Sequence, residues 1–314
     1  MRTLRFHEYG DALDVLRLDD AQIPDPSPGQ VRVRVEACGL TPADWALYTG
    51  LFAGELPRGV GLEVAGTVSA VGAEVEQVGV GDAVFGPAPF NGPTAGASDE
   101  AVLDYWAQRP EGLSVIDAAA LPMAVETAYR ALDELGVFAA ATDSVLVHGA
   151  GSTVGFAAVQ MALEHGARVA ATAGGTYATA LEDLGALVTT YGDGMVDRIL
   201  TLTGGTVAFA LDAAPLGGGC LDELARVTGA ADHVLTITDF EGAERVGARV
   251  SVGTESTQRN DVLAHYGHLA AAGRFRVPVA RVFPLDQWRE AAEPSMGHAG
   301  GKVVLRTADD HIDE

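Results

Sequence analysis

A run of small residues at positions 149–155 (GAGSTVG) has a composition and a place in the chain that fit phosphate binding. The apolar segment 144–148 (SVLVH), typical of a strand, precedes it, and 153–166 (TVGFAAVQMALEHG), typical of a helix, follows it. A small-residue turn between a strand and a helix lets the backbone approach a pyrophosphate, and the helix N-terminus offers unpaired N–H groups and a positive dipole end. We therefore expect a dinucleotide site here; the alternative is a tight turn in another doubly wound fold.

The next expected strand ends where the adenosine ribose of a bound dinucleotide would lie. The residues there, 171–177 (ATAGGTY), include no carboxylate, which would hold the 2′-hydroxyl of NAD and repel a 2′-phosphate. They also include no lysine or arginine to attract a 2′-phosphate, but Thr172, Thr176 and backbone amides can donate hydrogen bonds to one. We interpret this segment as favouring NADP(H).

Strand-like and helix-like segments alternate along the middle of the chain. Residues 117–135 are helix formers with apolar positions about three to four apart. The expected strands are 144–148, 167–172, 187–191, 207–211 and 233–238. Strands at this spacing, separated by helices, indicate βαβ units and a parallel sheet. The nearly continuous apolar runs VLV, VAFAL and VLTI are typical of strands that are buried on both faces.

The two ends of the chain have a different pattern, rich in β-structure. In the segment 31–35 (VRVRV) the valines would point one way and the arginines the other, as in a half-buried antiparallel strand. From about residue 274 we expect a strand (RFRVPVARVFP), a helix (DQWREAAE) and a strand (GKVVLR). The simplest account is an α/β nucleotide-binding domain at 118–274, inserted into a β-rich domain formed by 1–117 and 275–314.

Composition and charge exclude several classes of protein. The chain has 314 residues, is 48% hydrophobic and has a formal net charge of −23, which fits about two folded domains and not a disordered chain. So acidic a protein is not expected to bind nucleic acids or anionic membranes, which attract lysine and arginine. No apolar stretch approaches the roughly 18 residues of a membrane span, and the N-terminus lacks an apolar signal core. We expect a soluble, cytoplasmic protein.

Six motifs, taken together and in this order, resemble one family of enzymes. They are CGLTPADW (38–45), GLEVAGTVSAVG (61–72), VGVGDAVFG (78–86), LPMAVETAYRAL (121–132), VLVHGAGSTVG (145–155) and GKVVL (301–305). The chain resembles the medium-chain dehydrogenases/reductases, and among them the zinc-free quinone oxidoreductases, over nearly its whole length. The resemblance implies an α/β protein with a GroES-like β-barrel catalytic domain and a Rossmann-type doubly wound parallel-sheet cofactor domain. It also implies NADPH-dependent hydride transfer to a quinone or an α,β-unsaturated carbonyl (an enone or enoyl substrate), commonly by a homodimer.

The residues at the family's zinc positions predict that the chain holds no metal. Zinc-dependent relatives carry a Cys at the position of Thr41 and a His at the position of Leu62, and leucine cannot ligate zinc. The four cysteines of their structural zinc lobe have no counterpart in 86–101, and the chain has only two cysteines, Cys38 and Cys220. We expect Cys38 to be a small buried hydrophobe.

The motifs and the resemblance together assign candidate site residues. For the cofactor they are Ala150, Gly151, Ser152, Thr153, Val154, Thr172, Ala173, Gly174, Tyr191, Thr236 and Ile237. For catalysis they are Thr41, Asp44, Tyr48 and Thr127. Thr41, Tyr48 or backbone N–H groups are the candidate donors to a developing oxyanion, and Tyr48 or water is the candidate proton source. The resemblance places Thr127 and Val154 at the nicotinamide and Tyr191 near the 2′-phosphate.

Several of these assignments have a structural alternative. Asp44 could be a buried, hydrogen-bonded structural carboxylate, Thr127 could bond the carbonyl four residues before it, and Tyr191 could be a surface aromatic. The chain also departs from the family, because Thr41 replaces the usual Asn and 152–155 read STVG instead of GGVG. These departures leave open a non-redox biosynthetic step (a cyclase, isomerase or dehydratase) and a non-enzymatic NADPH-binding protein.

Overall fold

The computed structural model describes residues 1–139, 144–215, 220–251, 257–296 and 300–307 of the chain. The chain divides into two compact units, one formed by Met1–Met123 with Asn260–Glu314 (unit 1) and the other by Ala124–Arg259 (unit 2). Among the described residues, no helix is long and apolar enough to cross a membrane.

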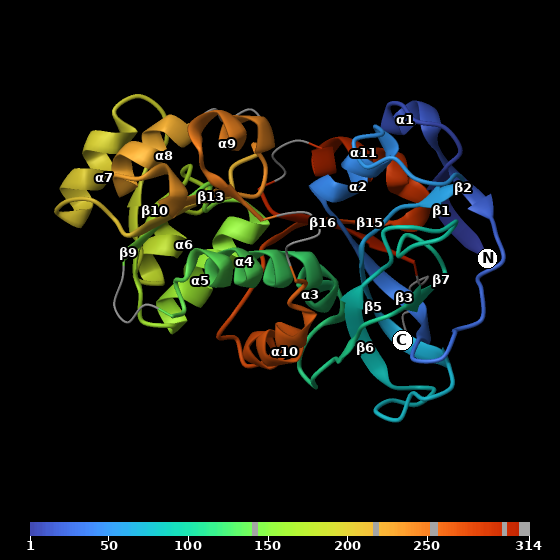
Figure 1. The fold of residues 1–314 in the computed structure, drawn as a ribbon. Coiled ribbons are helices and arrows are strands. Elements are labelled where there is room, and N and C mark those ends of the chain that lie inside the picture. Colours follow the sequence, from blue (N-terminus) through green and yellow to red (C-terminus); the bar gives the residue numbers. More distant parts are fainter. Residues whose placement is uncertain (140–143, 216–219, 252–256, 297–299, 308–314) are drawn as a thin grey trace. The chain divides into compact units, whose positions relative to one another are not determined.

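Unit 1 consists mainly of antiparallel strands in two sheets (Figure 1). Its strands are β1 (Arg2–Phe6), β2 (Leu16–Asp20), β3 (Val31–Leu40), β4 (Arg58–Gly59), β5 (Glu63–Val71), β6 (Ala83–Pro87), β7 (Glu100–Leu103), β8 (Ala107–Gln108), β15 (Val279–Pro284) and β16 (Lys302–Arg306). Its helices are α1 (Ala12–Val15), α2 (Pro42–Tyr48), α3 (Val115–Ala120), α10 (Leu263–Ala271) and α11 (Trp288–Met296), with 3-10 turns at Asn260–Val262 and Leu285–Gln287. One sheet has the order β15-β16-β3-β5-β6-β8, with β7 on β3, and the other has the order β2-β1-β4. Because β16 pairs with β3, segments from both ends of the chain share one sheet.

The alternation in β3 has the expected consequence for burial. Val31, Val33 and Val35 are buried, while the arginines between them are partly or fully exposed. The strand pairs antiparallel with β5, β7 and β16, which confirms the predicted antiparallel strand. Cys38 in the same strand is fully buried in the apolar core, which confirms the expectation of a small buried hydrophobe.

Unit 2 is a six-stranded parallel sheet, with α8 and α9 on one face and α4 and α5 on the other (Figure 1). Its strands are β9 (Ser144–His148), β10 (Arg168–Thr172), β11 (Leu187–Thr189), β12 (Phe209–Asp212), β13 (Val234–Thr236) and β14 (Arg249–Val250). Its helices are α4 (Pro122–Leu135), which enters the unit at Ala124, α5 (Thr153–Glu164), α6 (Ala178–Asp183), α7 (Met195–Thr203), α8 (Leu221–Thr228) and α9 (Phe240–Val246), with a 3-10 turn at Ala231–His233. The strand order is β11-β10-β9-β12-β13-β14, and every neighbouring pair is parallel.

This sheet confirms the predicted βαβ series. Successive strands run outward from β9 to β11 on one side and from β12 to β14 on the other, so the winding reverses between β9 and β12. In such sheets ligands bind outside the carboxyl ends of the strands at the point of reversal. The strand β14 was not expected, because its two residues are exposed and carry no apolar run.

Candidate functional site

The loop after β9 and the first turn of α5 contain two glycines that the packing requires, Gly149 and Gly155, and one, Gly151, that has open space beside it. Gly149 has φ +73°, and a Cβ on it would lie 2.5 Å from backbone atoms of Ala214. A Cβ on Gly155 would lie 2.4 Å from the carbonyl oxygen of Gly149. A Cβ on Gly151 would meet nothing closer than Tyr177 Cδ2 at 3.7 Å. The backbone at Gly151 is therefore open to close approach by a ligand.

The N-terminus of α5 follows this loop and can hold an anion. Ser152 is the N-cap, and its Oγ accepts a hydrogen bond from the N–H of Gly155 at 3.0 Å. The N–H groups of Thr153 and Val154, in the first turn, have no intrahelical acceptor. These N–H groups and the positive end of the helix dipole suit a pyrophosphate. The residues in this loop therefore fit a dinucleotide cofactor.

Thr172 and its neighbours lie at the carboxyl end of β10, where the ribose end of the cofactor was expected. The Thr172 hydroxyl is fully buried; it accepts from the N–H of Gly149 at 3.1 Å and lies 2.8 Å from His148 Nδ1. It therefore supports the glycine loop from within the unit. Ala173 is also buried, and its N–H donates to the Thr189 carbonyl. Of the three residues assigned here, only Gly174 is exposed.

A cation that the sequence analysis missed lies beside Tyr191. Tyr191 is 62% exposed, and its hydroxyl lies 4.0 Å from where a Cβ of Gly174 would be. Arg198 in α7 donates to the carbonyl oxygens of Thr190 at 2.8 Å and Asp193 at 2.6 Å, which holds the loop after β11. Its charge lies outside 171–177, so inspection of that segment alone could not reveal it. The structure brings Gly174, Tyr191 and a guanidinium to one edge of the sheet.

At the end of β13, Thr236 is fully buried. Its hydroxyl donates to Asp212 Oδ2 at 2.8 Å and accepts from the N–H groups of Thr238 and Asp239. Ile237 follows it half-buried, with its N–H donating to the Asp212 carbonyl at 3.2 Å. Both residues therefore fasten β13 to β12 at the carboxyl edge of the sheet.

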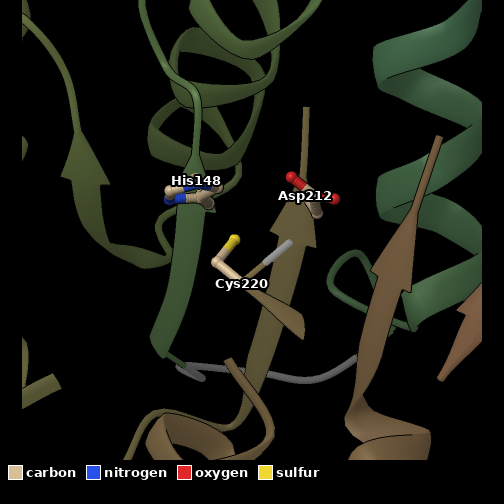
Figure 2. A group of neighbouring side chains, drawn as sticks. All are labelled: His148, Asp212 and Cys220. Atoms are coloured by element: carbon tan, nitrogen blue, oxygen red, sulfur yellow. The ribbon is translucent and has the colours of Figure 1, made fainter. Parts of the chain in front are cut away.

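His148, Asp212 and Cys220 form a cluster at the same edge (Figure 2). Each offers one potential metal ligand, and these three atoms lie within 4.8 Å of one another. Burial raises the pKa of Asp212, lowers that of His148 and raises that of Cys220 to about 12. Sequence spacing does not reveal this cluster, because its members come from three separate segments that only the fold brings together.

In unit 1, Asp44 is the centre of a buried hydrogen-bond network. Its Oδ2 accepts from the N–H of Thr41 at 2.8 Å and from the Thr41 hydroxyl at 3.2 Å, and its Oδ1 accepts from the N–H of Gly61 at 2.6 Å. Thr41 is the N-cap of α2, and Pro42 occupies the first turn. Burial raises the pKa of Asp44 to about 6. The network fits the structural alternative for Asp44, a carboxylate that joins α2 to the loop before β5.

Tyr48 and Thr127, the other catalytic candidates, lie in different units. Tyr48 is 2% exposed and packs edge-on against Phe6, and within the described residues its hydroxyl has no hydrogen-bond partner. Burial raises the pKa of Tyr48, which disfavours its ionisation. Thr127 in α4 is half-buried and donates to Glu126 Oε2 at 3.2 Å rather than to the carbonyl four residues before it.

Two family models match the chain, an alcohol dehydrogenase GroES-like domain over residues 27–105 and a zinc-binding dehydrogenase domain over 178–305. The structure is similar to that of a quinone oxidoreductase from Coxiella burnetii, with a TM-score of 0.80, 27% identity and coverage of 98% of this chain and 99% of that one. The chain belongs to the medium-chain dehydrogenase/reductase superfamily. The GroES-like domain and the Rossmann-like parallel sheet expected for this superfamily are confirmed.

Among curated proteins, the chain is similar to quinone oxidoreductase from Homo sapiens. The identity is 37% over 180 residues, which is 55% of this chain and 53% of that protein. It is also similar to 2-methylene-furan-3-one reductase from Solanum lycopersicum, with 34% identity over 203 residues, 59% of this chain and 50% of that protein. The chain spans about half the length of the curated relatives it matches.

The zinc positions of this superfamily can be tested on the side chains of unit 1. Leu62 is fully buried hydrocarbon, and the Thr41 hydroxyl is bound to Asp44. Glu63, beside Leu62, is fully buried and forms an ion pair with Lys302 at 2.5 Å. These residues do not fit a catalytic zinc site, which needs about three Cys, His, Asp or Glu ligands.

Proposed function

We propose that this chain is an NADPH-dependent, zinc-independent oxidoreductase that transfers a hydride to a quinone or an α,β-unsaturated carbonyl. The observation that carries the proposal is the open backbone at Gly151, directly before the α5 N-terminus and at the reversal point of the parallel sheet. The chemistry named for the human and tomato relatives, reduction of a quinone and of a 2-methylene-furan-3-one, supports the acceptor class.

The proposed cofactor contacts follow the edge of the sheet. The pyrophosphate binds the backbone around Gly151 and the N–H groups of Thr153 and Val154. The adenosine 2′-phosphate lies near Tyr191 and Arg198, where a positive charge is present and the end of β10 has no carboxylate. Both features favour NADPH over NADH.

The proposed reaction transfers two electrons and two protons in total. When bound, NADPH would supply a hydride to a quinone or to the β-carbon of an α,β-unsaturated carbonyl, and one further proton from the site would complete the reduction. We retain Thr127 as the candidate residue at the nicotinamide. The burial of Tyr48 favours water over Tyr48 as the proton source. The Thr41 hydroxyl donates to Asp44, which argues against Thr41 as the donor to an oxyanion.

Two further assignments are part of this proposal. We assign the catalytic domain to residues 1–117 and 275–314 and the nucleotide-binding domain to 118–274. We also propose a cytoplasmic homodimer. Size-exclusion chromatography with light scattering tests the dimer, and a mass of one chain would contradict it.

The direct test is a titration of the purified, cofactor-stripped chain with NADPH and with NADH, followed by nicotinamide fluorescence. We expect NADPH to bind at least about tenfold more tightly, which corresponds to about 1.4 kcal/mol. The variant Arg198→Gln should weaken NADPH binding more than NADH binding. A preference for NADH would overturn the interpretation of 171–177. The absence of binding by either would refute the proposed function and favour the non-redox alternative.

A further inference from the structure

Three side chains of ligand type converge where the sheet of unit 2 reverses (Figure 2). His148 and Asp212 are the last residues of β9 and β12, and they lie opposite each other in the parallel register. Cys220 precedes α8. His148 is 6% exposed and Asp212 is 3% exposed, so both polar groups are withdrawn from bulk water.

Helix capping does not explain the position of Cys220. It stands at the N-cap of α8, but its side chain makes no capping hydrogen bond, and cysteine is not among the residues favoured there. Its sulfur lies between His148 and Asp212 in Figure 2. The thiol is therefore turned toward the imidazole and the carboxylate.

The hydrogen bonds around the cluster exclude a nucleophilic Cys–His–Asp triad. In such a triad one ring nitrogen binds the thiol and the other binds the carboxylate. Here Nδ1 of His148 is bonded to Thr172 Oγ1 at 2.8 Å, which leaves only Nε2. A metal ion needs only one nitrogen from the ring, so the bond between Nδ1 and Thr172 leaves Nε2 to act as the metal ligand.

We infer that His148, Asp212 and Cys220 form a binding site for one zinc ion. Imidazole nitrogen, carboxylate oxygen and thiolate sulfur are all zinc ligands, and three protein ligands leave a fourth position for water. One thiolate and one carboxylate balance the two charges of Zn²⁺, so the buried complex is neutral. This site lies in unit 2, whereas the superfamily's zinc positions at Thr41 and Leu62 lie in unit 1.

The surroundings of the cluster hold the ligands in place. Thr172 orients the His148 ring, while the Thr236 hydroxyl and the N–H of Ala214 donate to the two oxygens of Asp212 at 2.8 Å and 3.1 Å. Nitrogen and sulfur ligands of tetrahedral zinc lie about 3.5 Å apart. The three ligand atoms, which here lie within 4.8 Å of one another, would therefore move roughly 1 Å closer together on binding. The bound ion would join β9, β12 and the start of α8, next to the glycine loop.

The test measures metal content and not activity. A chelator removes metal from the full chain, and the chelator is then removed. The protein is incubated with ZnCl₂ and passed through a desalting column, and bound zinc is measured by mass spectrometry. We expect one ion per chain. The variant Cys220→Ala should lose it, with affinity reduced by more than about 100-fold. The variant Cys38→Ala is the matched control, because Cys38 is the other cysteine and lies in unit 1, and it should retain the ion.

Two further measurements separate a specific site from surface binding. Co²⁺ should produce a thiolate charge-transfer band in the wild-type chain and in Cys38→Ala but not in Cys220→Ala. Zn²⁺ should raise the unfolding temperature of the wild-type chain, and Mg²⁺, which prefers all-oxygen ligands, should not. Asp212→Asn should also lose zinc. No zinc in the wild-type chain, or equal zinc in Cys220→Ala, would overturn the site whatever the outcome of the NADPH titration.

Discussion

Replacing Lys302, the only lysine of the chain, should destabilise unit 1 strongly. Lys302 Nζ lies 2.5 Å from Glu63 Oε2, and the two side chains are 3% and 0% exposed. Glu63 Oε1 also accepts from the N–H of Met123 at 2.8 Å. Burial raises the pKa of Glu63 to about 7 even with the ammonium beside it. Among the described residues, Lys302 is the one cation that forms an ion pair with this buried carboxylate.

The variant Lys302→Met keeps most of the side-chain volume and removes the charge. Breaking a buried ion pair from one side costs about 3–5 kcal/mol, because the remaining charge stays buried and unpaired. For a unit of this size each kcal/mol lowers Tm by about 2–4 °C, so we expect a fall of roughly 10 °C near pH 8. The loss should shrink toward pH 5. A raised pKa means that the native state holds the Glu63 proton more tightly than the unfolded chain, so stability falls as pH rises from about 4.5 to about 7.

Tryptophan fluorescence provides a selective assay, because all three tryptophans (Trp45, Trp106 and Trp288) belong to unit 1. The matched control is Lys302→Met with Glu63→Gln, in which the Gln carbonyl can still accept from Met123 while no charge is left buried. We expect this double variant to recover most of the lost Tm. Lys302→Met melting within about 2 °C of the wild type at pH 8, or a double variant as unstable as the single one, would refute the reasoning.

Four other substitutions test the two units separately. Gly149→Ala should lower the Tm of unit 2, measured by circular dichroism, because its Cβ would lie 2.5 Å from the Ala214 backbone; Gly151→Ala should leave Tm unchanged but weaken NADPH binding at least about tenfold. Unchanged affinity in Gly151→Ala would contradict the phosphate assignment. Tyr48→Phe should leave turnover unchanged and stability within about 1 kcal/mol, because its hydroxyl has no partner within the described residues; a tenfold loss of turnover would restore Tyr48 as a proton donor. Burial raises the Asp44 pKa to about 6, so the native state holds that proton more tightly than the unfolded chain, and stability falls as pH rises from about 4 to 6. Asp44→Asn should reduce this fall. A difference between the urea midpoints at pH 4.5 and pH 7 that equals the wild-type difference would contradict this.

Features set by local sequence were predictable, and features set by contacts between distant segments were not. The valines of β3 and the apolar run of β9 have the periodicity of their strands, so their burial follows from the sequence. The strand expected from residue 274 begins only at Val279, after Pro278, which has no N–H group for a strand ladder. Arg198 reaches the loop after β11 from a later helix, which no inspection of 171–177 could show.

The inward orientation of Thr172 was also beyond the sequence. A threonine at the end of a strand can face a ligand or the interior, and the choice depends on the partners that the fold supplies. Here the Gly149 N–H and the His148 ring occupy its hydroxyl. The sequence therefore predicts which polar residue types lie at the carboxyl edge of the sheet, while the direction of each hydroxyl depends on tertiary contacts.

The departure of residues 152–155 from the family's GGVG pattern has a local explanation that leaves the proposed cofactor site intact. Serine is a favoured N-cap, and the Ser152 hydroxyl accepts from the Gly155 N–H. Serine at position 152 therefore stabilises the start of α5, and its hydroxyl is occupied by this capping bond. The proposed anion-binding groups are backbone N–H groups, which any non-proline residue at positions 153 and 154 supplies. Packing requires glycine at 149 and 155, so residues 152 and 153 can vary without changing the backbone geometry of the proposed cofactor site.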